Sequence, residues 1–196
     1  MAISDSDIVI YLTGATSDGG SQADPDASLG NYRSSSTITS DADENLFDDV
    51  SGEEASDGDT EYRCYCVKNE HGSLDLTDAK VYLSDSDIGG TNTVSFAVEV
   101  PETSNLTDGN AQTIANESTA PTSINTTGHN GTGSGVSNWS TATTKSGGVA
   151  LDIGAHDADL GSGEIIFVWV KRVIASGASA ASGVDFGVKI EGDTAA

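Results

Sequence analysis

The chain has little of the positive charge that nucleic-acid-binding proteins use. Its 196 residues hold 8 Lys and Arg against 31 Asp and Glu, which gives a formal net charge of −23. Such a surface repels phosphate groups, so we expect no direct binding to DNA or RNA. The first hundred residues carry 21 acids against 4 bases, and the remainder carry 10 against 4. This excess suits a saline setting, marine or halophilic, where salt screens the repulsion.

Cysteine, aromatic residues and long apolar runs are also scarce. Cys64 and Cys66 are the only cysteines, and their spacing within one strand disfavours a bond between them, so we expect two reduced thiols. The aromatic content of 6% leaves the core to Val, Ile and Leu. No run approaches the roughly eighteen apolar residues that span a bilayer. No basic segment precedes an apolar one at the N-terminus. These features predict a soluble protein made in a cytoplasm, without membrane contact.

Motifs that carry catalysis are missing as well. The sequence contains no G-x-S-x-G elbow, Walker loop or dinucleotide glycine fingerprint. His71, His129 and His156 lack the Cys/His spacing of a zinc site. A pair of carboxylates is all that a glycosidase needs, but this chain offers few aromatic and basic side chains to contact a substrate. We therefore expect no enzyme activity, no catalytic residue and no cofactor.

Acidic residues recur in pairs at alternate positions. The pairs are Asp5/Asp7, Asp41/Asp43 (followed by Asn45), Asp57/Asp59, Asp85/Asp87 and Asp157/Asp159. Calcium is bound by carboxylates in this kind of loop, which makes a weak calcium site a hypothesis. The run that begins at Asp41 starts like an EF-hand loop, but Leu46 stands at its glycine position and Gly52 at its bidentate acid. With 31 acids such pairs arise by chance, so the sequence assigns no metal ligand.

The chain does contain the two-residue periodicity that is typical of β-strands. In residues 61–67 (EYRCYCV), Tyr62, Cys64 and Cys66 share one phase and Arg63, Tyr65 and Val67 share the other, which indicates a strand covered on both sides. The turn residues 69–72 (NEHG) separate it from a second strand, 74–83, whose parity slips near Thr77-Asp78. One extra residue at that point, a β-bulge, restores a single buried face. We interpret 61–83 as a central hairpin.

Further strands are predicted on both sides of this hairpin. The ranges are 8–12, a short ambiguous 36–39, 93–100, 149–153, 164–173 and 184–190, with a loop over 14–31 and an acidic turn over 52–60. The run 164–173 (EIIFVWVKRV) is the best partner for Tyr62–Asn69, and Trp169 is expected in the core. The pattern predicts one all-β domain, 1–196, an antiparallel β-sandwich of jelly-roll or immunoglobulin-like type. Tyr62 and Cys64 match an immunoglobulin tyrosine corner in spacing, but no further cysteine bridges the sheets.

The segment 102–148 is different in kind. In Thr122–Gly148, 21 of 27 residues are Ser, Thr, Asn or Gly. A free segment of that composition buries too little to offset its ordering entropy, so we interpret it as an extended arm that is ordered by contact. The alternative is a meandering pair of weak strands. The segment also carries N-x-S/T acceptors at Asn105, Asn116, Asn125, Asn130 and Asn138, which such a tract generates automatically.

Two stretches carry a resemblance to a known class of protein. They are NLFDDVSGEEASDGDTEYRCYCVKNEHGSLDLTDAKVYL (45–83) and LGSGEIIFVWVKRVIASGASAASGVDFGVKIEGD (160–193). Both are similar to core strands of small all-β virion proteins of tailed phages and related archaeal viruses, found among head and neck structural proteins. The resemblance implies a structural role as a capsid decoration or cement protein, located in the virion and assembled in the host cytoplasm. It also implies the major capsid protein or other virion proteins as partners, and a homo-oligomer with a trimer favoured.

The alternative function is a carbohydrate-binding or adhesin sandwich at a fibre tip or cell surface. Exposed aromatic side chains distinguish this alternative, because sugars stack on aromatic rings. The candidates are Trp139, Tyr11, Tyr32, Tyr65 and Tyr82.

Overall fold

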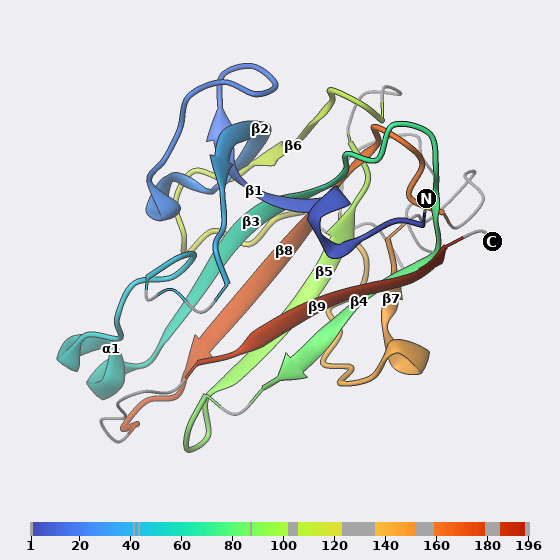
Figure 1. Cartoon of the computed structure of the whole chain (residues 1–196). Coiled ribbons are helices and arrows are strands. Elements are labelled where there is room, and N and C mark those ends of the chain that lie inside the picture. The colour runs from blue at the N-terminus through green and yellow to red at the C-terminus, as the bar shows by residue number, and fades with distance from the viewer. Residues whose placement is uncertain are drawn as a thin grey trace.

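The computed structural model describes residues 2–40, 42, 44–86, 88–101, 106–122, 136–151, 159–178 and 185–194. Within these ranges the chain forms two antiparallel sheets that pack as a curled sandwich (Figure 1), which confirms the predicted all-β class. The larger sheet has the order β5-β8-β3-β1-β2-β6, and the smaller has β7-β4-β9. The strands are β1 (Ile8–Ala15), β2 (Gly30–Thr37), β3 (Asp59–Asn69), β4 (Leu76–Asp85), β5 (Thr93–Glu99), β6 (Asn110–Thr113), β7 (Val149–Ala150), β8 (Ile165–Ile174) and β9 (Gly187–Thr194).

Helical structure is confined to short pieces in the described residues. The α-helix α1 spans Gly52–Asp57, where the sequence predicts only an acidic turn, so that prediction is wrong. Three single 3-10 turns, η1 (Asp5–Asp7), η2 (Pro25–Ala27) and η3 (Lys145–Gly147), lie in connections. No helix in the described part of the chain is long and apolar enough to cross a membrane.

The centre of the larger sheet is the pairing of β3 with β8. Their antiparallel register runs from Asp59 opposite Ile174 to Lys68 opposite Ile165. This confirms the predicted partnership, and its cause is that residues 63–67 of β3 and 165–170 of β8 are buried on both faces and need cover on each. Trp169 stands opposite Cys64 and is fully buried, as expected.

The predicted hairpin between residues 61–69 and 74–83 is wrong. β3 is hydrogen-bonded to β1 and β8, so both its edges are taken, and β4 joins the other sheet between β7 and β9. The buried Asn69 fixes the crossing, because its side-chain amide donates to the carbonyl oxygens of Leu74 and Leu160, both at 2.9 Å. The predicted bulge is confirmed: the β4–β9 register shifts between Thr77 and Lys80, and Asp78 has a φ of 46°.

Two apolar layers lie on opposite faces of the larger sheet. The layer between the sheets includes Val67, Val81, Phe96 and Val168. The layer on the outer face includes Cys64, Cys66 and Trp169, and connecting segments cover it with residues such as Val136 and Ile114. The molecule is therefore a small sheet, a large sheet and a coat of loops.

The described parts of the segment 102–148 belong to this coat. Residues 110–113 form β6, which pairs with β2, and both Ala111 and Val136 are fully buried. Ser137 and Ser140 donate backbone hydrogen bonds to Val98 and Phe96 of β5 at 2.8 Å each. These parts therefore pack on the chain's own domain, as weak strands would. Residues 102–105 and 123–135 lie outside the described residues.

Candidate functional site

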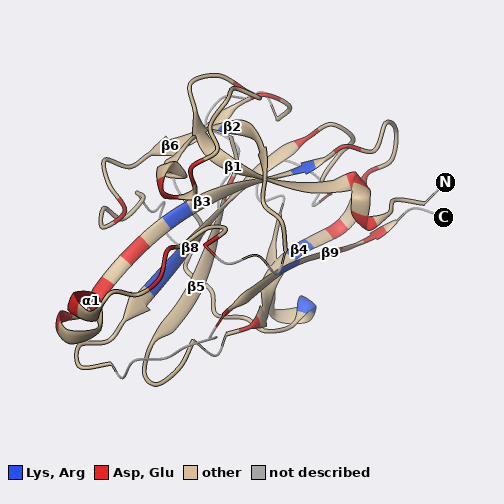
Figure 2. Ribbon diagram, turned by 60° about the vertical axis from the view of Figure 1, so that its left-hand side comes forward, with Lys and Arg blue, Asp and Glu red and all other residues tan. Residues whose placement is uncertain are grey.

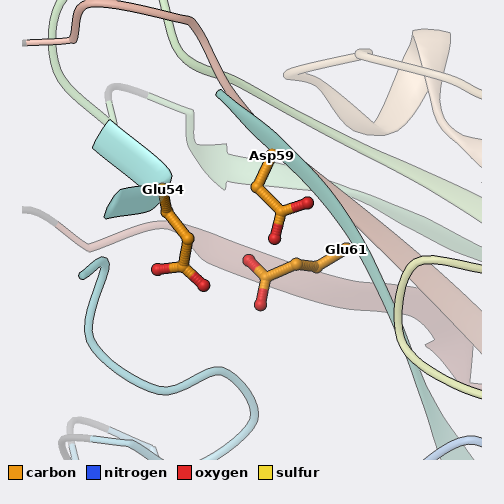
Figure 3. Close-up of side chains that lie close together, drawn as sticks. All are labelled: Glu54, Asp59 and Glu61. Atoms are coloured by element: carbon orange, nitrogen blue, oxygen red, sulfur yellow. The ribbon is translucent and has the colours of Figure 1, made fainter. Parts of the chain in front are cut away.

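Three carboxylates meet where α1 leads into β3. Glu54 lies on α1, while Asp59 and Glu61 are alternate residues of β3, so they share the face directed toward the smaller sheet. One oxygen of each lies within 4.8 Å of the others, and the three groups point toward a common space (Figure 3). We call Glu54, Asp59 and Glu61 the acidic cluster.

A capping box places Glu54. The Ser51 hydroxyl accepts the Glu54 backbone N–H at 3.2 Å, and the Glu54 carboxylate accepts the Ser51 N–H at 2.6 Å. Gly58 then ends the helix with a φ of 82°, a conformation that glycine adopts without strain. The sequence Ser-Gly-Glu-Glu thus sets one carboxylate above the first residues of β3.

Glu61 is the buried member of the cluster. Its side chain is only 1% exposed, and its Oε2 accepts from Arg172 Nε at 2.6 Å. Arg172 stands directly across from it in the β3–β8 register. Burial raises the pKa of Glu61 above its usual 4.5, although the arginine acts in the opposite direction. The Arg172 guanidinium thus stabilises the charged form of Glu61 against the cost of its burial.

Two buried arginines flank the cluster on this face. Arg172 also donates to the backbone oxygen of Asp48 at 2.7 Å, and its guanidinium lies 4.7 Å from the centre of the Phe47 ring. Arg63 lies 5.5 Å from the same ring and pairs with Asp26 and Glu117 at 3.1 and 2.5 Å. Figure 2 shows the result as acidic segments at α1 and the start of β3 beside basic segments of β3 and β8.

The cluster is suited to holding a cation better than to catalysis. Calcium takes oxygen ligands at about 2.3–2.6 Å, so two of its ligands are at most about 5 Å apart, and the cluster satisfies this limit. A hydrolase needs both carboxylates open to a substrate, whereas Glu61 is buried and already bonded to Arg172. Of the paired acids singled out in the sequence, Asp59 alone enters this cluster. Its neighbours Glu54 and Glu61 were missed, and the Ser51–Glu54 capping pattern was the available signal.

Two of the other paired acids make local structural contacts. Asp7 accepts from the Ser4 backbone and hydroxyl at 2.7 Å and so caps η1, and Asp159 accepts from Asp78 N at 3.1 Å. Asp57 and Asp85 lie at the surface. Asp41, Asp43, Asp87 and Asp157 lie outside the described residues.

The remaining groups with reactive potential are engaged in the fold. Cys64 and Cys66 are fully buried free thiols, and burial raises the pKa of both, so neither is a nucleophile at neutral pH. His71 Nδ1 accepts the backbone N–H groups of Ser73 and Leu74 at 3.2 and 3.0 Å, which closes the turn after β3. His129 and His156 lie outside the described residues.

The candidate aromatic residues are mostly covered. Tyr11, Tyr65 and Tyr82 are at most 8% exposed, which removes them as a sugar-stacking surface. Trp139 is half-buried, with its ring centre 5.6 Å from that of Tyr62 and 5.1 Å from Lys171 Nζ. Of the glycosylation acceptors, Asn116 and Asn138 are exposed, and Asn105, Asn125 and Asn130 lie outside the described residues.

Sequence reasoning also missed a buried carboxylate on the outer face of the larger sheet. Glu99 is fully buried on β5, where it accepts from Trp169 Nε1 at 2.6 Å and from the Gln112 backbone at 3.0 Å. Glu99 alternates with apolar residues, so a solvent-facing position was the natural interpretation. Its partner Trp169 is 70 residues away and carries no local signal.

Fold and contacts define an all-β, sandwich-like protein. Within its described residues the buried charged side chains form ion pairs or, for Glu99, hydrogen bonds to neutral groups. Comparisons with protein-family models, with curated proteins and with solved structures found no match to this chain.

Proposed function

We propose that the chain is a non-enzymatic structural protein of a virion, a decoration or cement protein that bridges neighbouring subunits of a tailed virus head. The observation that carries the proposal is the use of every described thiol, imidazole and buried charge in internal contacts. Cys64, His71 and Glu99 all have roles in the fold itself. A protein of this kind works through contact area on its outer surfaces rather than through a reactive centre.

The resemblance to virion proteins is the reason for proposing a virus particle as the assembly. The two similar stretches, 45–83 and 160–193, contain β3, β4, β8 and β9. They include the central strands of both sheets, so the similarity concerns the framework and not a site. A pocket lined by residues such as Val100, Leu106 and Leu151 has room for no more than a water-sized molecule. Neither feature favours a small-molecule substrate.

The carbohydrate-binding alternative rests on the two candidate aromatic residues that are only half-buried, Tyr32 and Trp139, of which Trp139 lies beside Tyr62. The rings of Trp139 and Tyr62 are inclined at 53°, so they do not form one flat stacking platform. Contact between Trp139 and Lys171 gives this side chain a structural role in attaching the loop coat to β8. The decoration role is therefore the better supported.

The proposal is tested by measuring whether the chain is part of purified virus particles. Particles are purified from the source culture by density gradient, and the chain is quantified in each fraction with an antibody. We expect the chain in fractions that contain encapsidated DNA and major capsid protein, in a stoichiometric ratio that survives repeated banding. A chain found only in the soluble fraction contradicts the proposal. Binding to a glycan array that Trp139→Ala abolishes supports the alternative.

A further inference from the structure

We propose that two copies of this chain associate edge to edge through β9, antiparallel and around a two-fold axis beside Ile190. This inference is independent of the proposed function. β9 is the border strand of the smaller sheet, hydrogen-bonded to β4 on one side (Figure 1). Its eight residues, Gly187–Thr194, include none that is buried, in contrast with β4 and β8. A border strand of this length presents a row of backbone groups that can pair with another strand.

The direction of these backbone groups follows from the register. Leu83 donates to Ala142 and Ala79 accepts from Leu151, so after the bulge the odd-numbered residues of β4 from Ala79 to Leu83 face β7, and Lys80 and Tyr82 face β9. Tyr82 and Lys80 stand opposite Lys189 and Glu191. Lys189 and Glu191 therefore bond to β4, and Val188 and Ile190 direct their N–H and C=O groups outward. No other described residue is hydrogen-bonded to those outward groups.

The other sheet borders are short or covered. Ser137 and Ser140 bond to the outer edge of β5. In the part of β3 that β1 leaves uncovered, the backbone N–H groups of Tyr62 and Cys64 donate to the carbonyl oxygens of Glu117 and Ser28. The remaining border strands, β6 and β7, have four and two residues. The described part of the chain thus covers or shortens its borders everywhere except at β9.

The charge pattern of β9 favours β9 of a second copy as the strand that pairs with it. An antiparallel pair centred on Ile190 sets Ile190 opposite Ile190, and Lys189 of each copy opposite Glu191 of the other. Both side chains face solvent, 53% and 40% exposed, and within one copy they form an ion pair at 3.1 Å, with Glu191 also accepting from the Tyr82 hydroxyl. The contacts across the axis therefore extend an existing ion pair into a four-charge network. Pairs at positions without backbone bonds bring side chains closest, and opposite charges there are favourable. Val188 and Ile190, half-buried at the open border, gain cover from their counterparts.

The net charge of −23 on each copy opposes this association, and salt weakens that opposition. We therefore expect a dimer whose dissociation constant falls as monovalent salt rises from low to molar concentration. Sedimentation equilibrium of the full chain across both protein and salt concentration measures this. A monomer at submillimolar protein in molar salt overturns the proposal. A trimer, which the virion resemblance favours, also overturns it, because two-fold pairing closes at two copies.

Charge reversal tests the register itself. Lys189→Glu sets Glu opposite Glu across the axis, and Glu191→Lys sets Lys opposite Lys, so each variant alone should dissociate about tenfold more readily. Mixed together, the two variants should recover a one-to-one heterodimer, because every cross-strand pair is again Lys with Glu. The double swap should also recover the homodimer.

The matched control is Lys68→Glu, which makes the same change in net charge on β3 of the other sheet and should leave the dimer at wild-type strength after allowance for total charge. Circular dichroism and melting curves establish that all variants are folded. Equal dimerisation of wild type and Lys189→Glu, or no heterodimer in the mixture, places any interface elsewhere and overturns the inference.

Discussion

Removing the indole N–H of Trp169 tests the outer apolar layer. Trp169 is fully buried on β8, and its Nε1 donates at 2.6 Å to Glu99, which is fully buried as well. Trp169→Phe keeps a ring in the layer and deletes the donor. Glu99 then keeps its bonds from Gln112 but has one charge-assisted bond fewer. Trp169→Ala also removes the ring.

The structure gives a magnitude for each change. Loss of one partner of a buried charged group costs roughly 1–3 kcal/mol, so Trp169→Phe should lower the free energy of unfolding by about 2 kcal/mol. Trp169→Ala adds a cavity and should cost about 3–5 kcal/mol or more. A folded domain has about 5–15 kcal/mol in total, so the alanine variant should approach complete unfolding.

Urea unfolding followed by circular dichroism measures both values, and an unchanged slope shows that the unfolded states are comparable. A double-mutant cycle with Glu99→Gln isolates the Trp169–Glu99 bond from the lost ring volume. We expect a coupling of about 1–2 kcal/mol. A cost below about 0.5 kcal/mol for Trp169→Phe together with zero coupling refutes the reasoning for the hydrogen bond. A cost below about 1 kcal/mol for Trp169→Ala refutes the burial of β8.

Three further predictions concern charge. Because the chain carries −23, its melting temperature should rise from low to molar sodium chloride, and a flat profile would show that the acids serve only solubility. Burial raises the folded-state pKa of Glu61, so its charged form lowers the stability of the fold at neutral pH. As pH falls toward 4.5, the unfolding free energy of wild type should therefore rise relative to that of Glu61→Gln. A difference between the two that does not change with pH would contradict this. Calcium should raise the melting temperature at low salt, a chelator should reverse the rise, and Asp59→Asn should abolish it, with Asp57→Asn as the matched control.

The parts of the fold that could be predicted are those where one short pattern determines burial. The run 165–170 is apolar on both phases and 62–67 is mostly apolar or aromatic on both, and two such strands have few ways to be covered except beside each other. The bulge at Thr77-Asp78 could be predicted because a slip in alternation needs an extra residue. The hairpin failed because alternation gives a strand's buried face and not its neighbour, and a turn such as 69–72 also serves a crossing between sheets.

The candidate site could be predicted only in fragments. Asp59 was singled out as half of an acid pair, but its cluster partners come from a helix turn and from the next inward position of β3. The Ser51–Glu54 capping pattern was readable, yet the surrounding acids favoured a turn. Arg172 could not be connected with Glu61 from sequence, because only the β3–β8 register sets them opposite each other.

The described end of the Ser, Thr, Asn and Gly tract, residues 136–148, shows how a segment of this composition can be held by backbone contacts. A free segment of that composition stays disordered because it has little apolar surface to bury. Ser137 and Ser140 instead satisfy the exposed edge of β5 with backbone bonds, and Ser137 Oγ accepts a further one from Val98 N at 2.9 Å. The border strand of a sheet has backbone N–H and C=O groups that need hydrogen-bond partners, and a residue with a small side chain can supply them as well as one with a large side chain. Small polar residues suit this role because they approach the strand edge closely, and here they cover the border strand β5. The border strand β9, with its alternating Lys189 and Glu191, has no such cover from the described residues and remains open to a partner.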